Sequence, residues 1–165
     1  MNDDIRPDAN SRRRVLGGAL AAGFAMVLAS RLPEAAADSS PGGPVKLVCV
    51  LRRRPEMTPA QFDDFWLNVH APVAVKALTA LGATRYVQNH TIDSVLNTTI
   101  GVSHSTGAAF DGIAEAWFPS ERQLAEALAT PAGTEAGQAL ADHEKAFIDL
   151  PQSSFFVTTE HVLLG

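Results

Sequence analysis

Six segments of the chain carry the apolar patterns of strands and helices, and their order restricts the fold more than any other feature. Strand patterns are short runs of β-branched or alternating apolar residues, whereas helix patterns repeat apolar residues every three to four positions. They run in the order strand 45–51, helix 59–81, strand 83–91, strand 110–118, helical region 121–147 and strand 155–163. This order predicts an α+β fold of the ferredoxin-like βαββαβ type, with a four-stranded antiparallel sheet and helices on one face.

The first predicted helix has a defined beginning, a defined end and one irregularity between them. It starts at Thr58-Pro59-Ala60-Gln61, which provides an N-cap, a proline at the first helical position and a glutamine three residues after the cap. Gly82 ends it. Pro72 lies inside the helix, where it removes one backbone hydrogen bond and crowds the carbonyl of Asn68. We therefore expect a kink beside His70.

Residues 92–109 separate the second and third predicted strands. They are rich in Asn, Thr, Ser and Gly, with His104 in the middle. Compact domains rarely keep so long a loop without a use for it. Two interpretations follow: a lid or partner-facing flap, or a segment without fixed structure.

The N-terminal segment has the features of an export signal. Ser11-Arg12-Arg13-Arg14 precedes an uncharged run of small and apolar residues, and Ala35-Ala36-Ala37 follows as a cleavage site. A membrane anchor is the alternative, but a spanning helix needs roughly 20 mostly apolar residues and this run is shorter. The chain is therefore expected to pass through the twin-arginine translocase and to act in the periplasm or outside the cell. The predicted divisions are a cleaved signal (1–37), a linker (38–44) and one domain (45–165).

Charge and cysteine content exclude several classes of function. The chain has a formal net charge of −5, and Arg52-Arg53-Arg54 is the main basic cluster of the predicted domain. An acidic domain is a poor partner for a phosphate backbone, so no nucleic-acid partner is expected. Cys49 is the only cysteine, which excludes an internal disulfide and a cysteine-rich zinc site, and we expect it to be buried. No pair of closely spaced histidines occurs, so no metal site is predicted.

Three ionisable side chains are the strongest candidates for chemistry. His70 lies at the edge of the apolar helix face, where an imidazole that titrates near neutral pH can take and return a proton. The alternative is a core histidine bonded to a carbonyl at the kink. His90 shares a strand face with Tyr86 and Gln88, which suits either the polar floor of a pocket or an exposed edge strand. Glu115 lies near the centre of a strand, where an unpaired carboxylate is costly, so we expect it to be paired.

The remaining candidates have plainer interpretations. Asp111 shares a strand face with Glu115 and is expected to be solvated. His143 lies on a helical stripe of apolar residues and is expected in the core, although it is also the position best suited to hold a haem. Trp66 and Trp117 either pack in the core or provide a platform for a substrate. His104 and His161 are weaker candidates.

Four motifs span the predicted domain from Val45 to Leu164. They are Phe62-x-x-Phe65-Trp66-x-x-x-His70-Ala71-Pro72, Tyr86-Val87-Gln88-Asn89-His90, Asp111-Gly112-Ile113-Ala114-Glu115-Ala116-Trp117-Phe118 and Asp142-x-x-x-x-Phe147-Ile148-Asp149. Together they resemble the EthD family. The chain departs from the family pattern at Phe65, where a tyrosine is frequent, and in the length of the loop that contains His104.

This resemblance implies a fold, a set of site residues and a range of activities. The family's fold is the dimeric α/β barrel, which cofactor-free monooxygenases, isomerases, polyketide cyclases and haem-binding peroxidases share. His70 and His90 would then act as acid and base, while Tyr86, Gln88 and Asn89 place an oxygen of the substrate. The predicted catalytic residues are His70, His90 and Glu115. The predicted substrate-binding residues are Trp66, Tyr86, Gln88, Asn89, Trp117 and His143.

One function and two alternatives follow. We expect a protein that acts on a small apolar compound bearing a carbonyl or phenol, by cofactor-independent histidine acid–base chemistry of the lyase, isomerase or monooxygenase type. The alternatives are an oxidoreductase or an oxidase auxiliary in ether or xenobiotic degradation, which could bind haem, and a non-catalytic binding protein for a hydrophobic small molecule. Because helices cover one face of the sheet only, we also expect a homodimer that pairs through the open face.

Overall fold

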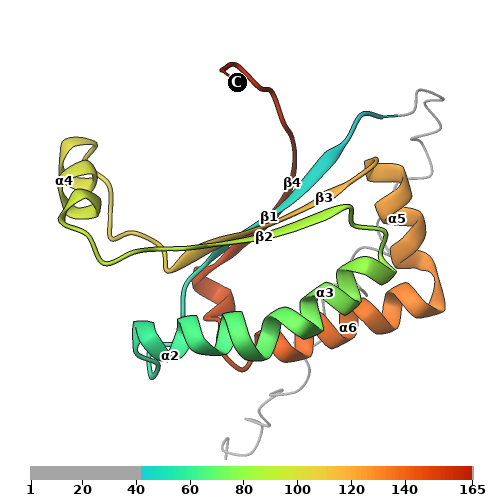
Figure 1. The fold of residues 1–165 in the computed structure, drawn as a ribbon, viewed down its shortest axis with the longest axis horizontal. Helices are drawn as coiled ribbons and strands as arrows, with labels where there is room; N and C mark the ends of the chain where they lie inside the picture. Colours follow the sequence, from blue (N-terminus) through green and yellow to red (C-terminus); the bar gives the residue numbers. More distant parts are fainter. Residues whose placement is uncertain (1–41, 165) are drawn as a thin grey trace, which may run out of the picture.

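Four strands form one antiparallel sheet in the computed structural model, which describes residues 42–164 (Figure 1). The predicted export signal (1–37) and the first part of the linker lie outside the described residues. The strands are β1 Val45–Leu51, β2 Arg85–His90, β3 Gly112–Phe118 and β4 Ser154–Thr159. Their order in the sheet is β2-β3-β1-β4, and each neighbouring pair is antiparallel. The ferredoxin-like arrangement predicted from the sequence is therefore confirmed.

The strand boundaries follow from pairing as much as from composition. β1 has the predicted bounds. β4 was predicted to continue to residue 163 but ends at Thr159, because Thr159 pairs with Val45, the first residue of β1. Beyond that pair the β1 ladder cannot be extended. The apolar residues that follow, Val162, Leu163 and Leu164, are highly exposed.

Helices cover one face of this sheet (Figure 1). They are α2 Pro59–Asp64, α3 Ala71–Ala80, α4 Val95–Ser103, α5 Glu121–Ala129 and α6 Pro131–Glu144, with a π-helical turn η1 Phe65–His70 between α2 and α3 and a 3₁₀ turn η2 Leu150–Gln152 before β4. The exception is α4, which projects beyond one end of the sheet. None of the helices within residues 42–164 has the length and apolar content that a bilayer-spanning segment requires.

The predicted capping box and the predicted irregularity are both present in the first helical region. Thr58 accepts a hydrogen bond from the Gln61 amide, and the Gln61 side chain accepts one from the Thr58 amide. Close to Pro72 the helix forms the π-helical turn η1, in which the Ala71 N–H donates to the carbonyl of Trp66, five residues earlier. A π-turn of this kind is a known cause of a local irregularity in a helix.

The long segment between β2 and β3 contains a helix that the sequence did not predict. Ser94 caps α4 by accepting a hydrogen bond from the Leu96 amide. Asn, Thr and Gly have low helix propensity, and no residue of α4 is buried, so periodicity and propensity both failed to indicate it. The helix carries exposed apolar side chains, including Val95 and Val102. This arrangement agrees with a flap rather than a segment without structure.

Alternation along the strands divides the sheet into a core face and an open face. Cys49 and Leu51 of β1 and Ala114 and Ala116 of β3 are buried beneath the helices. Trp66 approaches the core face of β3 closely, because a Cβ atom at Gly112 would lie 2.8 Å from Trp66 Cη2. Within the described part of the chain, the fully buried aromatic side chains are Phe62, Trp66, Phe118 and Phe147.

Candidate functional site

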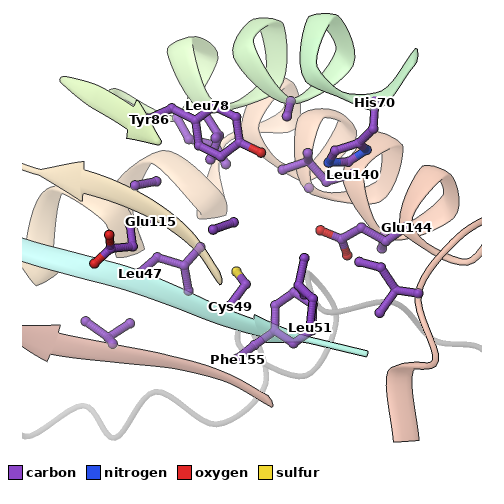
Figure 2. Close-up of a pocket in the computed structure, with 18 of the residues that line it drawn as sticks. Leu47, Cys49, Leu51, His70, Leu78, Tyr86, Glu115, Leu140, Glu144 and Phe155 are labelled. Carbon is purple, nitrogen blue, oxygen red and sulfur yellow. The ribbon is translucent and has the colours of Figure 1, made fainter. Parts of the chain in front are cut away.

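An apolar cavity of about 510 Å³ lies between the core face of the sheet and helices α3, α5 and α6 (Figure 2). Aliphatic side chains form most of its wall. They include Leu47, Leu51, Leu78, Leu124 and Leu140. Ionisable residues also line it, among them Cys49, His70, Tyr86 and Glu144. A cavity of this size and composition suits a small, mostly apolar ligand.

Glu144 lies at the end of α6, and its carboxylate is directed into the cavity (Figure 2). Among residues 42–164 the carboxylate has no hydrogen-bond or ion-pair partner. Burial raises its pKa from 4.5 to about 7. The negative end of the α6 dipole acts in the same direction. A carboxyl group that gains and loses a proton near neutral pH is suited to general acid–base catalysis.

His70 is buried at the end of the π-turn, with 4% of its surface exposed. Its Nδ1 lies 3.2 Å from Nδ1 of His143, and its ring packs 4.9 Å from that of Phe147. Burial, with a smaller contribution from His143, lowers the pKa of His70 from 6.5 to about 4. The expectation that His70 titrates near neutral pH is therefore wrong, because its cationic form loses the solvation that water provides. Its ring lines the cavity in the neutral state.

His90 faces the helices but lies outside the apolar cavity. Its Nδ1 is 2.9 Å from Asp63 Oδ1, and its Nε2 is 3.1 Å from Gln88 Oε1. It lines a second, more open depression together with Asp63, Leu67 and Gln88. β2 is an edge strand of the sheet, yet this face of it is covered by helix. The structure therefore does not place His70 and His90 in one site.

Tyr86 lines both depressions, and Trp66 lies between the apolar cavity and His90. The Trp66 ring packs 4.3 Å from the ring of His90, and the residue also lines the apolar cavity. The Tyr86 oxygen accepts a hydrogen bond from Gln88 Nε2 at 3.0 Å. Burial raises the pKa of Tyr86 above its usual value of 10, so the phenol keeps its hydrogen at neutral pH. Trp66, Tyr86 and Gln88 are thus the predicted binding residues that the structure brings together.

Three predicted site residues direct their side chains to the open face of the sheet. The Glu115 carboxylate pairs with Lys46 Nζ at 2.9 Å and accepts a hydrogen bond from Asn89 at 3.0 Å. Lys46 and Arg85 both lie over the ring of Trp117, 4.9 and 4.5 Å from its centre. Glu115 is one of the residues that line the apolar cavity, but its carboxylate is paired with lysine and asparagine rather than with a histidine. The Glu115 carboxylate and the side chains of Asn89 and Trp117 therefore lie on the sheet face opposite His70.

Asp111 was expected to be solvated and is instead paired. Its carboxylate binds the guanidinium of Arg53 and accepts a hydrogen bond from the Arg53 amide at 2.9 Å. Its own amide donates to the carbonyl of Leu51. These bonds connect Asp111, just before β3, to Leu51, the last residue of β1, and to Arg53, two residues beyond it. Asp111 and Arg53 therefore have a structural role.

The other histidines do not enter the cavity. His143 pairs with His70 but is not among the residues that line the cavity, so a haem bound there would lack the axial ligand that the sequence suggested. His104 ends α4 and is exposed, as is His161 in the C-terminal segment. Within residues 42–164 no cluster of three or more His, Cys, Asp or Glu side chains is arranged to hold a metal ion.

Glu144 is the residue that sequence reasoning missed. A glutamate near the end of a helix usually faces solvent, and the predicted stripe of α6 passed through Leu140 and His143. A second stripe at helical spacing, Gly137, Ala141, Glu144 and Ile148, was present and three of its members are buried. That stripe is the signal that could have found it.

The fold and the cavity together define a ferredoxin-like α+β domain with an apolar cavity between its sheet and its helices. The sequence model of the EthD domain matches residues 54–151, and the chain belongs to the EthD domain family. No curated protein matches the chain significantly.

Several solved structures are similar to this chain. An ethyl tert-butyl ether D (EthD) family protein from Bacillus halodurans C-125 has 21% sequence identity and a TM-score of 0.49, over 72% of this chain and 99% of that one. SnoaB, a cofactor-independent oxygenase from Streptomyces nogalater, has 18% identity and a TM-score of 0.45 over 74% and 98%. An EthD-like protein from Ralstonia eutropha JMP134 has 11% identity and a TM-score of 0.46 over 74% and 95%.

Proposed function

We propose that this protein binds a small apolar compound bearing a carbonyl or phenol oxygen in the cavity and transfers a proton on it, with Glu144 as the base. The observation that carries the proposal is an unpaired carboxylate with a pKa of about 7, directed into an apolar cavity. The Tyr86 hydroxyl, which keeps its hydrogen at neutral pH, lines the same cavity (Figure 2). The proposal replaces the histidine base expected from the sequence with a carboxylate.

The proposed reaction is the enolisation of a carbonyl compound, followed by return of the proton. Glu144 in its ionised form removes a proton from the carbon next to the carbonyl, and the electron pair of that C–H bond moves into the enolate. The Tyr86 hydroxyl donates a hydrogen bond to the oxygen on which the negative charge develops. Glu144 then returns the proton to the same or a neighbouring carbon, which gives exchange or isomerisation without any co-reactant.

Hydrogen exchange on a simple ketone tests this proposal before the natural substrate is known. Acetophenone is incubated in deuterated water with the wild-type protein, Glu144→Gln or Glu135→Gln, and loss of its methyl protons is followed by NMR. Glu135 is exposed on the same helix and serves as the matched control. We expect the wild type and Glu135→Gln to accelerate exchange, and Glu144→Gln to lose at least about 100-fold of that acceleration.

Binding without exchange would refute the catalytic proposal. If acetophenone stabilises the folded protein against heat while exchange proceeds at the rate of buffer, the cavity is that of a binding protein. Equal exchange rates for the wild type and Glu144→Gln would remove Glu144 as the base. A Soret band in protein isolated from its native host would support the haem-dependent alternative instead.

We also propose a homodimer that pairs through the open face of the sheet. This face carries Ile113 and Phe156, which are 38% and 46% exposed, beside the Lys46–Glu115 pair. Apolar side chains near the middle of a helix-free sheet face favour cover by another layer. We expect sedimentation to give a dimer at micromolar concentration and Phe156→Lys to shift it towards monomer. A monomeric wild type would contradict the pairing.

Export by the twin-arginine route is the third proposal. It rests on Arg12-Arg13 before the apolar run and on the alanine-rich cleavage site. Replacing both arginines by lysine should leave the uncleaved chain inside the cell. Cleavage and export that continue unchanged in that variant would contradict it.

A further inference from the structure

A chain of hydrogen bonds connects the protein surface to the Tyr86 hydroxyl, and it passes through His90. Asp63, whose side chain is 41% exposed, contacts His90 Nδ1 at 2.9 Å. His90 Nε2 contacts Gln88 Oε1 at 3.1 Å. Gln88 Nε2 in turn donates to the Tyr86 oxygen at 3.0 Å. His90 lies outside the cavity but is thereby linked to a group that lines it.

The carbonyl of Trp66 fixes the direction of the hydrogen bonds in this chain. A carbonyl oxygen can only accept, so the amide nitrogen of Gln88, 3.2 Å away, must face it. The amide oxygen of Gln88 then faces His90 Nε2, which has to carry a hydrogen. The other ring nitrogen, Nδ1, lies 2.9 Å from the carboxylate of Asp63. His90 therefore donates from Nε2 to Gln88 and is held on its other side by Asp63.

The direction of these bonds determines what the Tyr86 hydroxyl can do. Gln88 donates to the Tyr86 oxygen. Because the oxygen accepts this bond, the phenol directs its own hydrogen elsewhere. Figure 2 shows the Tyr86 hydroxyl directed into the cavity. The hydrogen is thus available to a group inside the cavity.

We propose that Asp63, His90 and Gln88 position Tyr86 so that its hydroxyl donates a hydrogen bond to the oxygen of a ligand in the cavity. His90 is then a positioning residue, and neither the acid nor the base. The identity of that ligand rests on the proposed function. The orientation of the Tyr86 hydroxyl is a property of the protein alone and is tested without a ligand.

The test uses the fact that Tyr86 is the only tyrosine in the chain. Difluorotyrosine incorporated in place of tyrosine labels this position alone, and its more acidic phenol can be titrated by fluorine NMR without strongly alkaline solution. The labelled proteins are the mature wild type, Gln88→Leu, His90→Leu and His90→Gln. His104→Ala, which changes an exposed histidine directly after α4, is the control.

The expected results follow from the loss of donors to the phenolate. Gln88→Leu raises the phenol pKa by about one, because a hydrogen bond to a charged oxygen is among the stronger ones. His90→Leu raises it less, since Gln88 remains but is no longer held in place. His90→Gln keeps an amide that can donate to Gln88 and restores most of the wild-type value. His104→Ala leaves the pKa unchanged.

Two outcomes would overturn the proposal. An unchanged Tyr86 phenol pKa in Gln88→Leu shows that Gln88 does not act on Tyr86. An unchanged phenol pKa in His90→Leu shows that His90 is not part of the hydrogen-bond series. Thermal unfolding identifies any variant that fails to fold. In that case Asp63→Asn, at the exposed end of this series of hydrogen bonds, is measured instead of the unfolded variant. It is expected to raise the phenol pKa by a smaller amount.

A ligand pair tests the contact to the cavity separately. Acetophenone has a carbonyl oxygen, and ethylbenzene has nearly the same shape without it. Tyr86→Phe should weaken acetophenone binding by about three- to tenfold and leave ethylbenzene binding unchanged. Equal loss for both compounds would refute the donated hydrogen bond. Failure of both to bind, with the phenol titrations as expected, would contradict the proposed function and leave the positioning chain intact.

Discussion

Replacing Glu144 by glutamine should make the stability of the protein respond differently to pH. The pKa of Glu144 is raised from 4.5 in the unfolded chain to about 7 in the folded protein. A raised pKa means that the folded state binds the proton more tightly, so the contribution of this group to stability is complete below about pH 4.5 and is lost as the pH rises through about 7. Glutamine has nearly the same shape and carries no charge at any of these pH values.

The size of the effect follows from the pKa difference. Each pKa unit corresponds to about 1.4 kcal/mol, so the wild type loses about 3 kcal/mol between pH 4.5 and 8 that Glu144→Gln retains. For a domain of this size that difference corresponds to roughly 10 °C in Tm. Any cost of burying the glutamine amide is independent of pH and cancels when two pH values are compared.

The assay is thermal unfolding followed by circular dichroism at about pH 4.5, 6, 7 and 8. The Tm of Glu144→Gln should rise relative to the wild type across this range. The control variant Glu135→Gln, which is exposed on the same helix, should follow the wild type at every pH. A constant Tm difference between Glu144→Gln and the wild type would show that Glu144 titrates as it does in water and would refute the argument for a base in the cavity.

Three further predictions concern groups around the cavity and the fold. His70 has a pKa lowered to about 4, so the wild type should lose about 3 kcal/mol as the pH falls from 6.5 to 4, and His70→Gln should resist acid unfolding in denaturant titrations. Gly112→Ala should lower stability by about 1–3 kcal/mol because its Cβ would overlap the Trp66 ring; wild-type stability in urea would contradict the close contact. Thr58→Ala should cost about 1 kcal/mol by removing the α2 cap, and an unchanged Tm would show that the capping box contributes nothing.

The sequence predicted the order of strands and helices because each is a local pattern. β1 was predicted to the residue, since its apolar run is bounded by a proline and glycine segment on one side and by arginines on the other. The α2 cap was predicted because three neighbouring residues supply all of its hydrogen bonds. The helix α4 was not predicted, because its residues have low helix propensity and none is buried.

The site was predicted less completely because it depends on which face each side chain occupies after packing. Alternation placed Tyr86, Gln88 and His90 together, and the structure agrees. The alternation of side chains between the two strand faces also grouped Glu115 and Trp117 on one face. The local sequence, however, does not determine which of the two faces the helices will cover. That choice placed Glu115 across the sheet from His70.

What the sequence determined by itself is therefore the fold and the inventory of polar groups, since periodicity and capping act within a few residues. Only the tertiary structure decided which of those groups share a cavity and what their ionisation is. Burial removes the water that stabilises the charged forms of both side chains, so the pKa of His70 falls to about 4 and the pKa of Glu144 rises to about 7. Glu144, rather than His70, therefore titrates near neutral pH. Desolvation of this kind is a property of the packed domain, and residues distant in the chain produce it.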